Sequence, residues 1–172
     1  MEFSSFFKYC PVCGSAAFVH NNEKSKRCEK CGFQYYMNAS AAVAAFVTDN
    51  KGRLLVCVRA HEPAKGTWDL PGGFVDNDES AEEACSRELK EELNIDVPKP
   101  KYIFSLPNVY QYSGLDIPTL DMFFEIKYDE KQEISVADDV SECFFVEREL
   151  LDLEKFGLTS IKKAVAMYKA DL

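Results

Sequence analysis

The chain has 172 residues, of which 47% are hydrophobic and 13% aromatic, and a formal net charge of −9. The length suits one core-bearing domain with a small appendage, and the apolar content excludes a disordered chain. The negative charge disfavours broad attraction to nucleic acid or anionic lipid. No stretch approaches the roughly 18 apolar residues of a membrane span, and the start lacks a signal-peptide pattern. We therefore expect a cytoplasmic protein without membrane contact.

The first segment, residues 1–37, contains two matching cysteine pairs. These are Cys10 with Cys13 and Cys28 with Cys31, each pair enclosing two residues and followed by a glycine. This spacing lets both thiolates of a pair reach one tetrahedral ion, and the glycine permits the tight turn around it. Four thiolates leave no open coordination position, so we predict a structural Zn²⁺ in a small zinc ribbon. An odd total of seven cysteines also favours metal binding over disulfides.

The charge of this segment leaves a second interpretation open. Residues 1–36 contain five basic side chains against three acidic ones, and Phe33, Tyr35 and Tyr36 offer rings on which bases can stack. Four thiolates on Zn²⁺ carry a net charge of −2, which these cations can offset. We therefore rank nucleic-acid binding below a purely structural role.

Two strands and a long loop follow the ribbon. Residues 41–49 and 53–59 are apolar, strand-like runs separated by a short polar turn ending in Gly52, which predicts a hairpin. The next stretch, residues 61–78, is polar and rich in proline and glycine, so it is not regular structure throughout. Loops of this length often carry function. Its His61 and Trp68 have ordinary surface and packing interpretations as well as functional ones.

A helix is predicted after this loop. Ser80 followed by Glu83 forms a capping box, and Asn94 tolerates the left-handed conformation of a C-cap. Further strands are predicted over residues 101–106, 120–128 and 141–147, and an amphipathic helix starts near residue 159, with Thr159 or Ser160 as its cap. This order of strands and helices indicates an α/β layered domain with a mixed sheet. Three cysteines in apolar runs are predicted to be buried thiols: Cys57, Cys85 and Cys143.

Glu88, Glu91 and Glu92 crowd one sector of the first predicted helix. At 100° per residue, Glu88 and Glu92 lie about 40° apart and Glu91 about 60° from Glu88. Like charges at these spacings repel, and the helix dipole already makes this end negative. A clustered set of carboxylate oxygens beside the apolar stripe of the helix indicates a bound divalent cation.

The loop and helix together resemble the Nudix box. Gly73 is followed after five residues by Glu79, and after seven more by Arg87-Glu88-Leu89-Lys90-Glu91-Glu92. Only the late glycine of the family pattern differs, since Asn94 stands there. The ribbon and residues 105–113 are similar to the NADH pyrophosphatase branch of the family. In that downstream segment Ser105, Pro107, Tyr110 and Ser113 agree with the branch pattern, whereas Leu106, Asn108, Val109 and Gln111 depart from it.

The resemblance implies a fold and an activity. The fold is a Nudix α/β/α sandwich with a mixed sheet over residues 38–172, preceded by the zinc ribbon of residues 1–37. The activity is hydrolysis of a pyrophosphate bond in a small nucleotide of the NAD(H) or ADP-ribose type, giving two monophosphates. Because members of the family are commonly dimers, a homodimer is one expected state.

The resemblance also implies site residues. Mg²⁺ or Mn²⁺ would be held by Glu88, Glu91, Glu92, the Gly72 carbonyl and a downstream acid, with Glu91 a further ligand or the water-activating base. Glu79 and Arg87 would orient the loop and the helix. Asp139, six residues before Phe145, is the first candidate for the downstream acid, and Asp138 and Glu142 are the others. The expected substrate contacts are Phe74, Tyr110 and Ser113.

Two other functions are compatible with the same residues. One is a nucleoside triphosphate pyrophosphohydrolase, which would release pyrophosphate. The other is an RNA-binding or partner-binding ribbon protein whose Nudix domain only senses a ligand. The complete set of box carboxylates argues against the second alternative.

Overall fold

The computed structural model describes residues 6–137 and 139–170. The chain forms two compact units. The first comprises the chain up to Ser40 together with Val109–Pro118, and the second comprises Ala41–Asn108 and Thr119–Leu172. Sequence reasoning did not anticipate that a hairpin tip distant in the sequence would group with the ribbon. The domain boundary expected between residues 37 and 38 stays a prediction.

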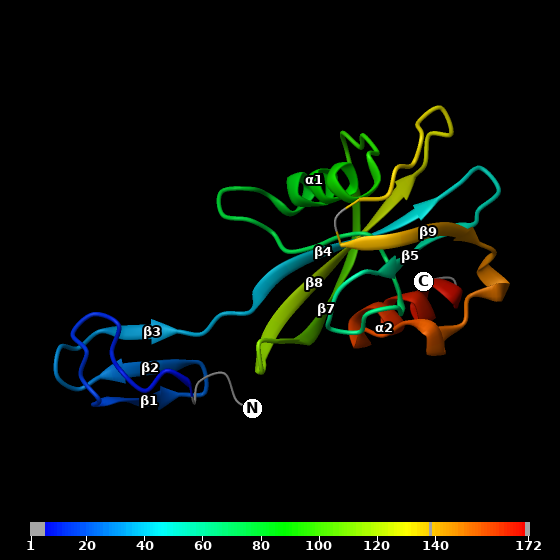
Figure 1. Ribbon diagram of the computed structural model, residues 1–172. Coiled ribbons are helices and arrows are strands. Elements are labelled where there is room, and N and C mark those ends of the chain that lie inside the picture. Colours follow the sequence, from blue (N-terminus) through cyan, green and yellow to red (C-terminus); the bar gives the residue numbers. More distant parts are fainter. Residues whose placement is uncertain (1–5, 138, 171–172) are drawn as a thin grey trace. The chain divides into compact units, whose positions relative to one another are not determined.

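The first unit contains a small antiparallel sheet of strands β1 (Phe18–Asn22), β2 (Ser25–Cys28) and β3 (Gln34–Tyr36) (Figure 1). Its core is minimal: the buried side chains are Cys10, Phe18 and Cys28, with a few half-buried neighbours. Sequence reasoning missed these strands because runs of three to five residues are too short to show a clear period.

The second unit contains most of a six-stranded sheet, of which the residues at Ser40 and Val109–Pro118 belong to the first unit. Its strands are β4 (Ser40–Thr48), β5 (Leu54–Arg59), β6 (Trp68–Asp69), β7 (Lys101–Tyr112), β8 (Leu115–Lys127) and β9 (Val140–Val146). They follow the order β6-β5-β4-β8-β7, and β9 pairs with β5. The helices are α1 (Ala81–Leu93) and α2 (Thr159–Lys169), with short 3-10 turns η2 (Arg148–Leu150) and η3 (Leu153–Lys155). Strand β7 continues beyond the predicted range 101–106, and β8 begins before the predicted range 120–128, so the hairpin they form is longer than expected.

Strand β4 divides two hydrophobic cores. Val43, Ala45 and Val47 pack in the cluster that contains Leu89 and the other apolar residues of α1. Ala44 and Phe46 pack in the cluster that contains Ile161 and the apolar residues of α2. Because both faces are covered, the strand reads as a continuous apolar run. The helices cover opposite faces of the sheet (Figure 1), which confirms the expected α/β/α sandwich.

Two local expectations were wrong. Helix α2 takes Leu158 as its N-cap, without a side-chain cap hydrogen bond, and Thr159 is already helical. The Ser160 hydroxyl instead donates to the buried Asp121 carboxylate in β8. Cys57 and Cys143 are not free thiols, because they form a disulfide across paired positions of β5 and β9. Cys85 is a buried free cysteine, as expected.

Candidate active site

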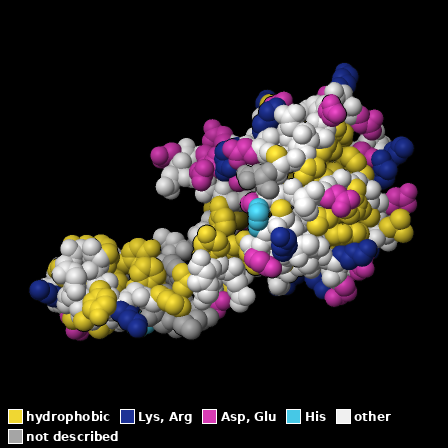
Figure 2. Space-filling view, in the orientation of Figure 1, with side chains coloured by type: hydrophobic (Ala, Val, Ile, Leu, Met, Phe, Trp, Pro, Cys, Tyr) yellow, Lys and Arg dark blue, Asp and Glu magenta, His cyan; other side chains and the backbone are white. Residues whose placement is uncertain are grey.

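Helix α1 begins and ends where its sequence signals predict. The Ser80 hydroxyl accepts from the Glu83 backbone N–H at 3.2 Å, and the Glu83 carboxylate accepts from the Ser80 backbone N–H at 2.8 Å. Asn94 adopts a left-handed conformation with φ of 59° and closes the helix. These caps fix the phase of the helix. Figure 2 shows acidic side chains gathered over α1 and the loop that precedes it.

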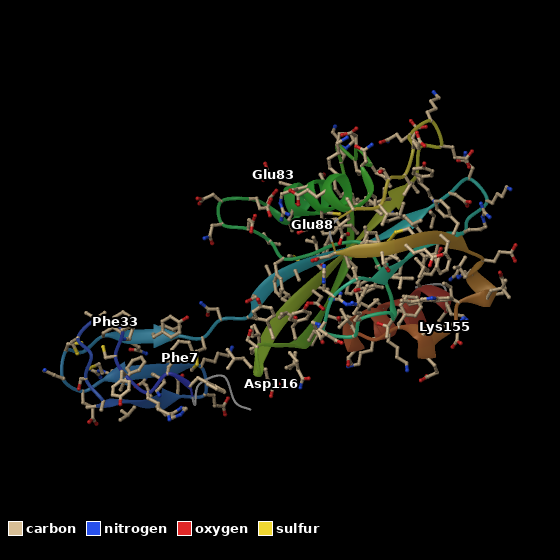
Figure 3. All side chains as sticks on the ribbon, in the orientation of Figure 1. Phe7, Phe33, Glu83, Glu88, Asp116 and Lys155 are labelled. Carbon is tan, nitrogen blue, oxygen red and sulfur yellow. A yellow bond between two sulfur atoms is a disulfide. The ribbon has the colours of Figure 1, made fainter. Side chains whose placement is uncertain are left out.

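The three glutamates of the predicted metal site differ in exposure. The Glu92 residue is 6% exposed, whereas the side chains of Glu88 and Glu91 are 15% and 50% exposed. Figure 3 labels Glu88 on α1. The carboxylates thus form a gradient from the core to solvent along one side of the helix.

Arg87 joins the loop to the helix. Its Nη2 lies 2.6 Å from Glu79 Oε1, its Nη1 lies 2.8 Å from Glu88 Oε1 and 3.0 Å from Glu91 Oε2. Nη2 also donates to the Phe74 carbonyl at 3.0 Å. Hydrogen bonding to Arg87 holds the pKa of Glu79 below its ordinary value. One guanidinium therefore offsets part of the repulsion among three carboxylates, with geometry suited to the predicted orienting role.

Glu92 carries the least compensated charge of the cluster. Its Oε2 accepts from the Gly72 backbone N–H at 3.0 Å. Burial raises the pKa of Glu92 to about 8, against that hydrogen bond, and the charges of Glu88, Asp69 and Asp139 raise it further. A divalent cation would relieve this electrostatic cost. The sequence predicts that the Gly72 carbonyl is a metal ligand. In the structure, Gly72 contacts this cluster through its N–H, which donates to Glu92.

The two glycines before α1 are required by close packing. A Cβ on Gly72 would lie 2.1 Å from the Val43 carbonyl oxygen, and its φ of +148° also disfavours other residues. A Cβ on Gly73 would lie 2.3 Å from Glu88 Oε1. The loop is therefore pressed between β4 and the acidic side of α1. This packing holds the Gly72 amide against the Glu92 carboxylate.

The candidates for the downstream acid differ in position. Asp139 is exposed, and one of its carboxylate oxygens lies 3.7 Å from His61 Nε2. Its backbone carbonyl accepts from the Ala60 N–H at 2.8 Å, and its charge contributes to the raised pKa of Glu92. Glu142 is exposed on β9, and Asp138 lies outside the described residues. Asp139 thus remains the preferred candidate, and its role stays a prediction.

The predicted substrate contacts are distributed over both units. Phe74 is 41% exposed, and its backbone forms a bridge with Ala42 in the second unit. Tyr110 and Ser113 belong to the first unit. Ser113 adopts a positive φ of 51° at the hairpin turn. Their roles in substrate binding stay predictions.

Sequence reasoning missed a buried polar group beside the candidate site. Arg59 Nη1 lies 2.5 Å from Asp69 Oδ2, and burial raises the pKa of Asp69 against the effect of Arg59. Asp121 is also buried, and it accepts from Asn108 at 2.9 Å and from Thr119 at 2.6 Å. The sequence did offer one signal for Asp69, because this acid stands among apolar and glycine residues in Trp-Asp-Leu-Pro-Gly-Gly, residues 68–73. Asp121 had no such signal, because two of its partners, Asn108 and Ser160, come from other segments of the chain.

The four ribbon cysteines form one cluster. Their sulfurs lie within 4.8 Å of one another, with Cys10 to Cys31 at 3.7 Å and Cys13 to Cys28 at 3.6 Å. Tetrahedral Zn²⁺ with bonds of about 2.3 Å requires sulfur separations of about 3.8 Å. The donor set and its spacing therefore fit a metal ion, as the sequence predicts.

Comparisons with known proteins agree with this geometry. A family model described as the NUDIX domain matches residues 38–167. The NAD-capped RNA hydrolase NudC of Stutzerimonas stutzeri is 33% identical over 57% of this chain, and that of Chromobacterium violaceum is 29% identical over 67%. The chain spans 35% and 47% of the lengths of these relatives, so it matches only part of each.

Solved structures show the same fold. A NUDIX hydrolase from Nitrosomonas europaea has a TM-score of 0.71 at 23% identity, covering 95% of this chain and 91% of that one. The NUDIX domain of Shewanella oneidensis NrtR, crystallised with ADP ribose, has a TM-score of 0.61 at 20% identity, covering 79% and 88%. None of the described helices has the length and apolarity to cross a membrane.

Proposed function

The chain belongs to the NUDIX family, and on this basis we propose that it hydrolyses the pyrophosphate bond of a nucleotide of the NAD(H) or ADP-ribose type. The observation that carries the proposal is the buried carboxylate of Glu92. This carboxylate accepts a hydrogen bond from the Gly72 N–H and lies near Glu88, in the last turn of the capped helix α1. Burying this charge is costly unless a ligand compensates it. The products would be two monophosphates.

The donor set fits Mg²⁺ or Mn²⁺. Glu88, Glu91, Glu92 and Asp139 supply the carboxylate oxygens that these hard cations prefer, and backbone oxygen from Gly72 completes the proposed set. Such ions, when bound, neutralise pyrophosphate charge and lower the pKa of water. Zn²⁺ in the ribbon would be structural, because four thiolates leave no position for substrate.

The protein residues have defined parts in this proposal. Glu91 is the most exposed of the three glutamates, so it is best placed to accept a proton from attacking water. Arg87 and Glu79 hold the loop against α1 and thereby fix the direction of Glu88. The buried Glu92 carboxylate is held in place by the hydrogen bond from the Gly72 N–H. Phe74, with Tyr110 and Ser113, is the proposed set of substrate contacts.

The substrate class rests on the relatives. Two relatives are named NAD-capped RNA hydrolases, and one fold neighbour was crystallised with ADP ribose. Both ligand names contain an adenosine diphosphate linked to a further group, which is the class the sequence predicts. These names include RNA, so they do not support the expectation that nucleic acid is disfavoured as a partner of this chain. A cytoplasmic location and a homodimer also remain proposals.

The test is product analysis with the full chain. NADH, ADP-ribose and a nucleoside triphosphate are incubated separately with Mg²⁺ or Mn²⁺, and the products are separated by chromatography. We expect AMP and a second monophosphate from NADH or ADP-ribose. Release of pyrophosphate from the triphosphate alone would favour the triphosphatase alternative and overturn the proposal.

The variant Glu92→Gln sharpens this test. Its turnover should fall by about 100-fold or more, because even the outer partners of metal ligands cost 10–100-fold when removed. The fold should persist, since the amide oxygen can still accept from Gly72. Glu82→Gln is the matched control, because Glu82 is exposed on the same helix and has no proposed role. Equal turnover in both variants would contradict the assignment of Glu92.

A further inference from the structure

Arg59 lies at the end of β5 and contacts two neighbouring segments with one guanidinium group. Its Nη1 lies 2.5 Å from Asp69 Oδ2, and its Nε donates to the Pro63 carbonyl at 2.8 Å. The side chains of Arg59 and Asp69 are only 18% and 10% exposed. Because a planar guanidinium holds its donors in fixed directions, it fixes Asp69 in β6 and the loop at Pro63 relative to each other.

Asp69 connects this contact to the buried glutamate of the candidate site. Its second carboxylate oxygen accepts from the Leu70 backbone N–H at 2.8 Å. Two residues further along, the Gly72 N–H donates to Glu92 Oε2 at 3.0 Å. The strand register pairs Asp69 with Cys57, which belongs to the apolar cluster of α1, so Asp69 lies on the face of the sheet that this helix covers. The charge of Asp69 also contributes to the raised pKa of Glu92.

The loop that follows Arg59 leads to the other end of the candidate site. The Arg59 carbonyl accepts from the Gly66 N–H at 2.9 Å, and its N–H donates to the Thr67 carbonyl at 3.1 Å, which closes the loop on the strand. The Ala60 N–H donates to the Asp139 carbonyl at 2.8 Å. Asp139, the preferred downstream acid, directly precedes β9, the strand that pairs with β5 (Figure 1).

The pairing of β5 with β9 changes register at this point. Arg59 lies opposite Val140, where regular pairing would place Ser141. Bulges of this kind redirect side chains and are over-represented next to active sites. The regular ladder therefore ends before Asp139, and the hydrogen bond from Ala60 holds this residue instead.

We propose that Arg59 is a positioning residue that fixes the separation of Glu92 and Asp139. It acts through Asp69 on the glycine loop before α1, and through the backbone that follows β5 on Asp139. This inference rests on the proposed function, because it concerns the same set of carboxylates. Removing outer partners of metal ligands costs about 10-fold to 100-fold in metal affinity. Since Arg59 acts through intermediate groups, the lower end of this range is expected.

A simpler role for Arg59 would be to neutralise the buried Asp69, and two variants separate the roles. Arg59→Lys keeps the charge, but an ammonium group lacks the fork that reaches both Asp69 and Pro63. Arg59→Met combined with Asp69→Asn removes one charge of each sign, so no buried charge is left uncompensated. The amide oxygen of this double variant can still accept from the Leu70 N–H.

Arg53, immediately before β5, offers a matched control. Its Nε and Nη2 each lie 2.7 Å from Asp49 Oδ2, and the Asp49 side chain is 3% exposed. Arg53→Lys therefore breaks the same kind of contact with a buried carboxylate, outside the candidate site. Both lysine variants should lose some stability, whereas only Arg59→Lys should also lose metal affinity.

The test titrates Mn²⁺ into the full chain without substrate and measures free Mn²⁺ by electron paramagnetic resonance. The protein is prepared with Zn²⁺, so that the ribbon cysteines are occupied. The Mn²⁺ dissociation constant should rise about 10-fold in Arg59→Lys and in the double variant, and stay within about 2-fold of the wild type in Arg53→Lys. In hydrolysis of NADH or ADP-ribose, the Mn²⁺ concentration for half-maximal rate should rise by the same factor, while kcat at saturating Mn²⁺ should recover.

The possible outcomes distinguish this inference from the proposed function. Equal Mn²⁺ affinities in the two lysine variants would overturn the inference and leave the proposed hydrolysis standing. Wild-type affinity in the double variant would also overturn it, because Arg59 would then only neutralise Asp69. If the wild type binds Mn²⁺ but hydrolyses neither nucleotide, the proposed function fails and the binding data alone decide the role of Arg59. Absence of Mn²⁺ binding by the wild type would contradict both.

Discussion

The two units of the chain are stabilised by different means. The first has a buried core of Cys10, Phe18 and Cys28, two of which are predicted metal ligands. The second has two large apolar clusters, one on each face of its sheet. Small domains bury too little apolar surface to be stable without a staple. The same chain therefore combines a unit whose core is a cysteine cluster that fits a metal ion with a unit held by apolar packing.

The largest expected effect is on the ribbon. Cys28→Ser, or removal of metal by a chelator, should unfold the ribbon and leave the second unit folded, because structural zinc supplies folding energy directly. Hydrogen exchange followed by mass spectrometry measures this. Peptides from residues 6–37 should lose protection, while peptides from β4 and α1 should keep it. Cys85→Ala is the control cysteine change, and a ribbon still protected without metal would contradict the comparison.

The reciprocal change weakens the second unit alone. Leu89 is fully buried on the apolar side of α1, so Leu89→Ala should lower the free energy of unfolding by about 2–5 kcal/mol. The single tryptophan, Trp68, belongs to this unit and reports its unfolding in denaturant. Met167→Ala, at a position 39% exposed in α2, is the control. A loss of ribbon protection in Leu89→Ala would show that the units do not fold independently.

A smaller effect concerns the site that the second unit positions. In Gly73→Ala the new methyl group would meet Glu88 Oε1, so this carboxylate must move. Displacement by about 1 Å can cost up to about 100-fold in rate, and we expect turnover to fall within that limit. Steady-state kinetics with NADH or ADP-ribose measure this. The denaturation midpoint is the internal control, because Gly73 is outside the left-handed region. Unchanged kinetics would show that the position of Glu88 is unimportant.

The smallest expected effect is on the free energy of unfolding, and it comes from a polar turn of the second unit rather than from its apolar core. Burial alone would raise the pKa of Asp49, but hydrogen bonds from Arg53 and Lys51 outweigh burial and lower it. The resulting stabilisation is therefore present above the unfolded pKa of about 3.8 and is lost as pH falls through the lower folded value. Asp49→Asn should be less stable than the wild type at pH 7, and the difference should shrink in acid. Urea unfolding at both pH values tests this, with Asp129→Asn at an exposed turn as the control.

Sequence reasoning was most successful where signals are local. The start of α1 at Ser80, its end at Asn94 and the acidic sector between them depend on residues a few positions apart. The ribbon cysteines were equally readable, because ligand spacing reflects the geometry of the metal. The fold class and the family followed from the resemblance of the loop and helix, including Gly73, Glu79 and Arg87, to the Nudix box.

The features that were missed depend on residues distant in the chain. Cys57 and Cys143 are 86 positions apart, and only the pairing of β5 with β9 brings them together. Ser160 looked like a helix cap because its partner, Asp121, lies 39 positions away on strand β8. The ribbon strands were hidden because runs of three to five residues are too short to show a repeating pattern. In the first two cases the missing information was a tertiary contact.

The alternation along β4 makes this strand intolerant of changes in length. Inserting one residue before Phe46 would turn its ring, and every following side chain of the strand, to the opposite face. Large groups would then meet the small ones of α1, and the mismatch would extend to the hairpin turn. Deletions or insertions in the polar loop at residues 61–66 reverse no side chains. We therefore expect natural length variation in this domain to collect in that loop and to be absent from β4.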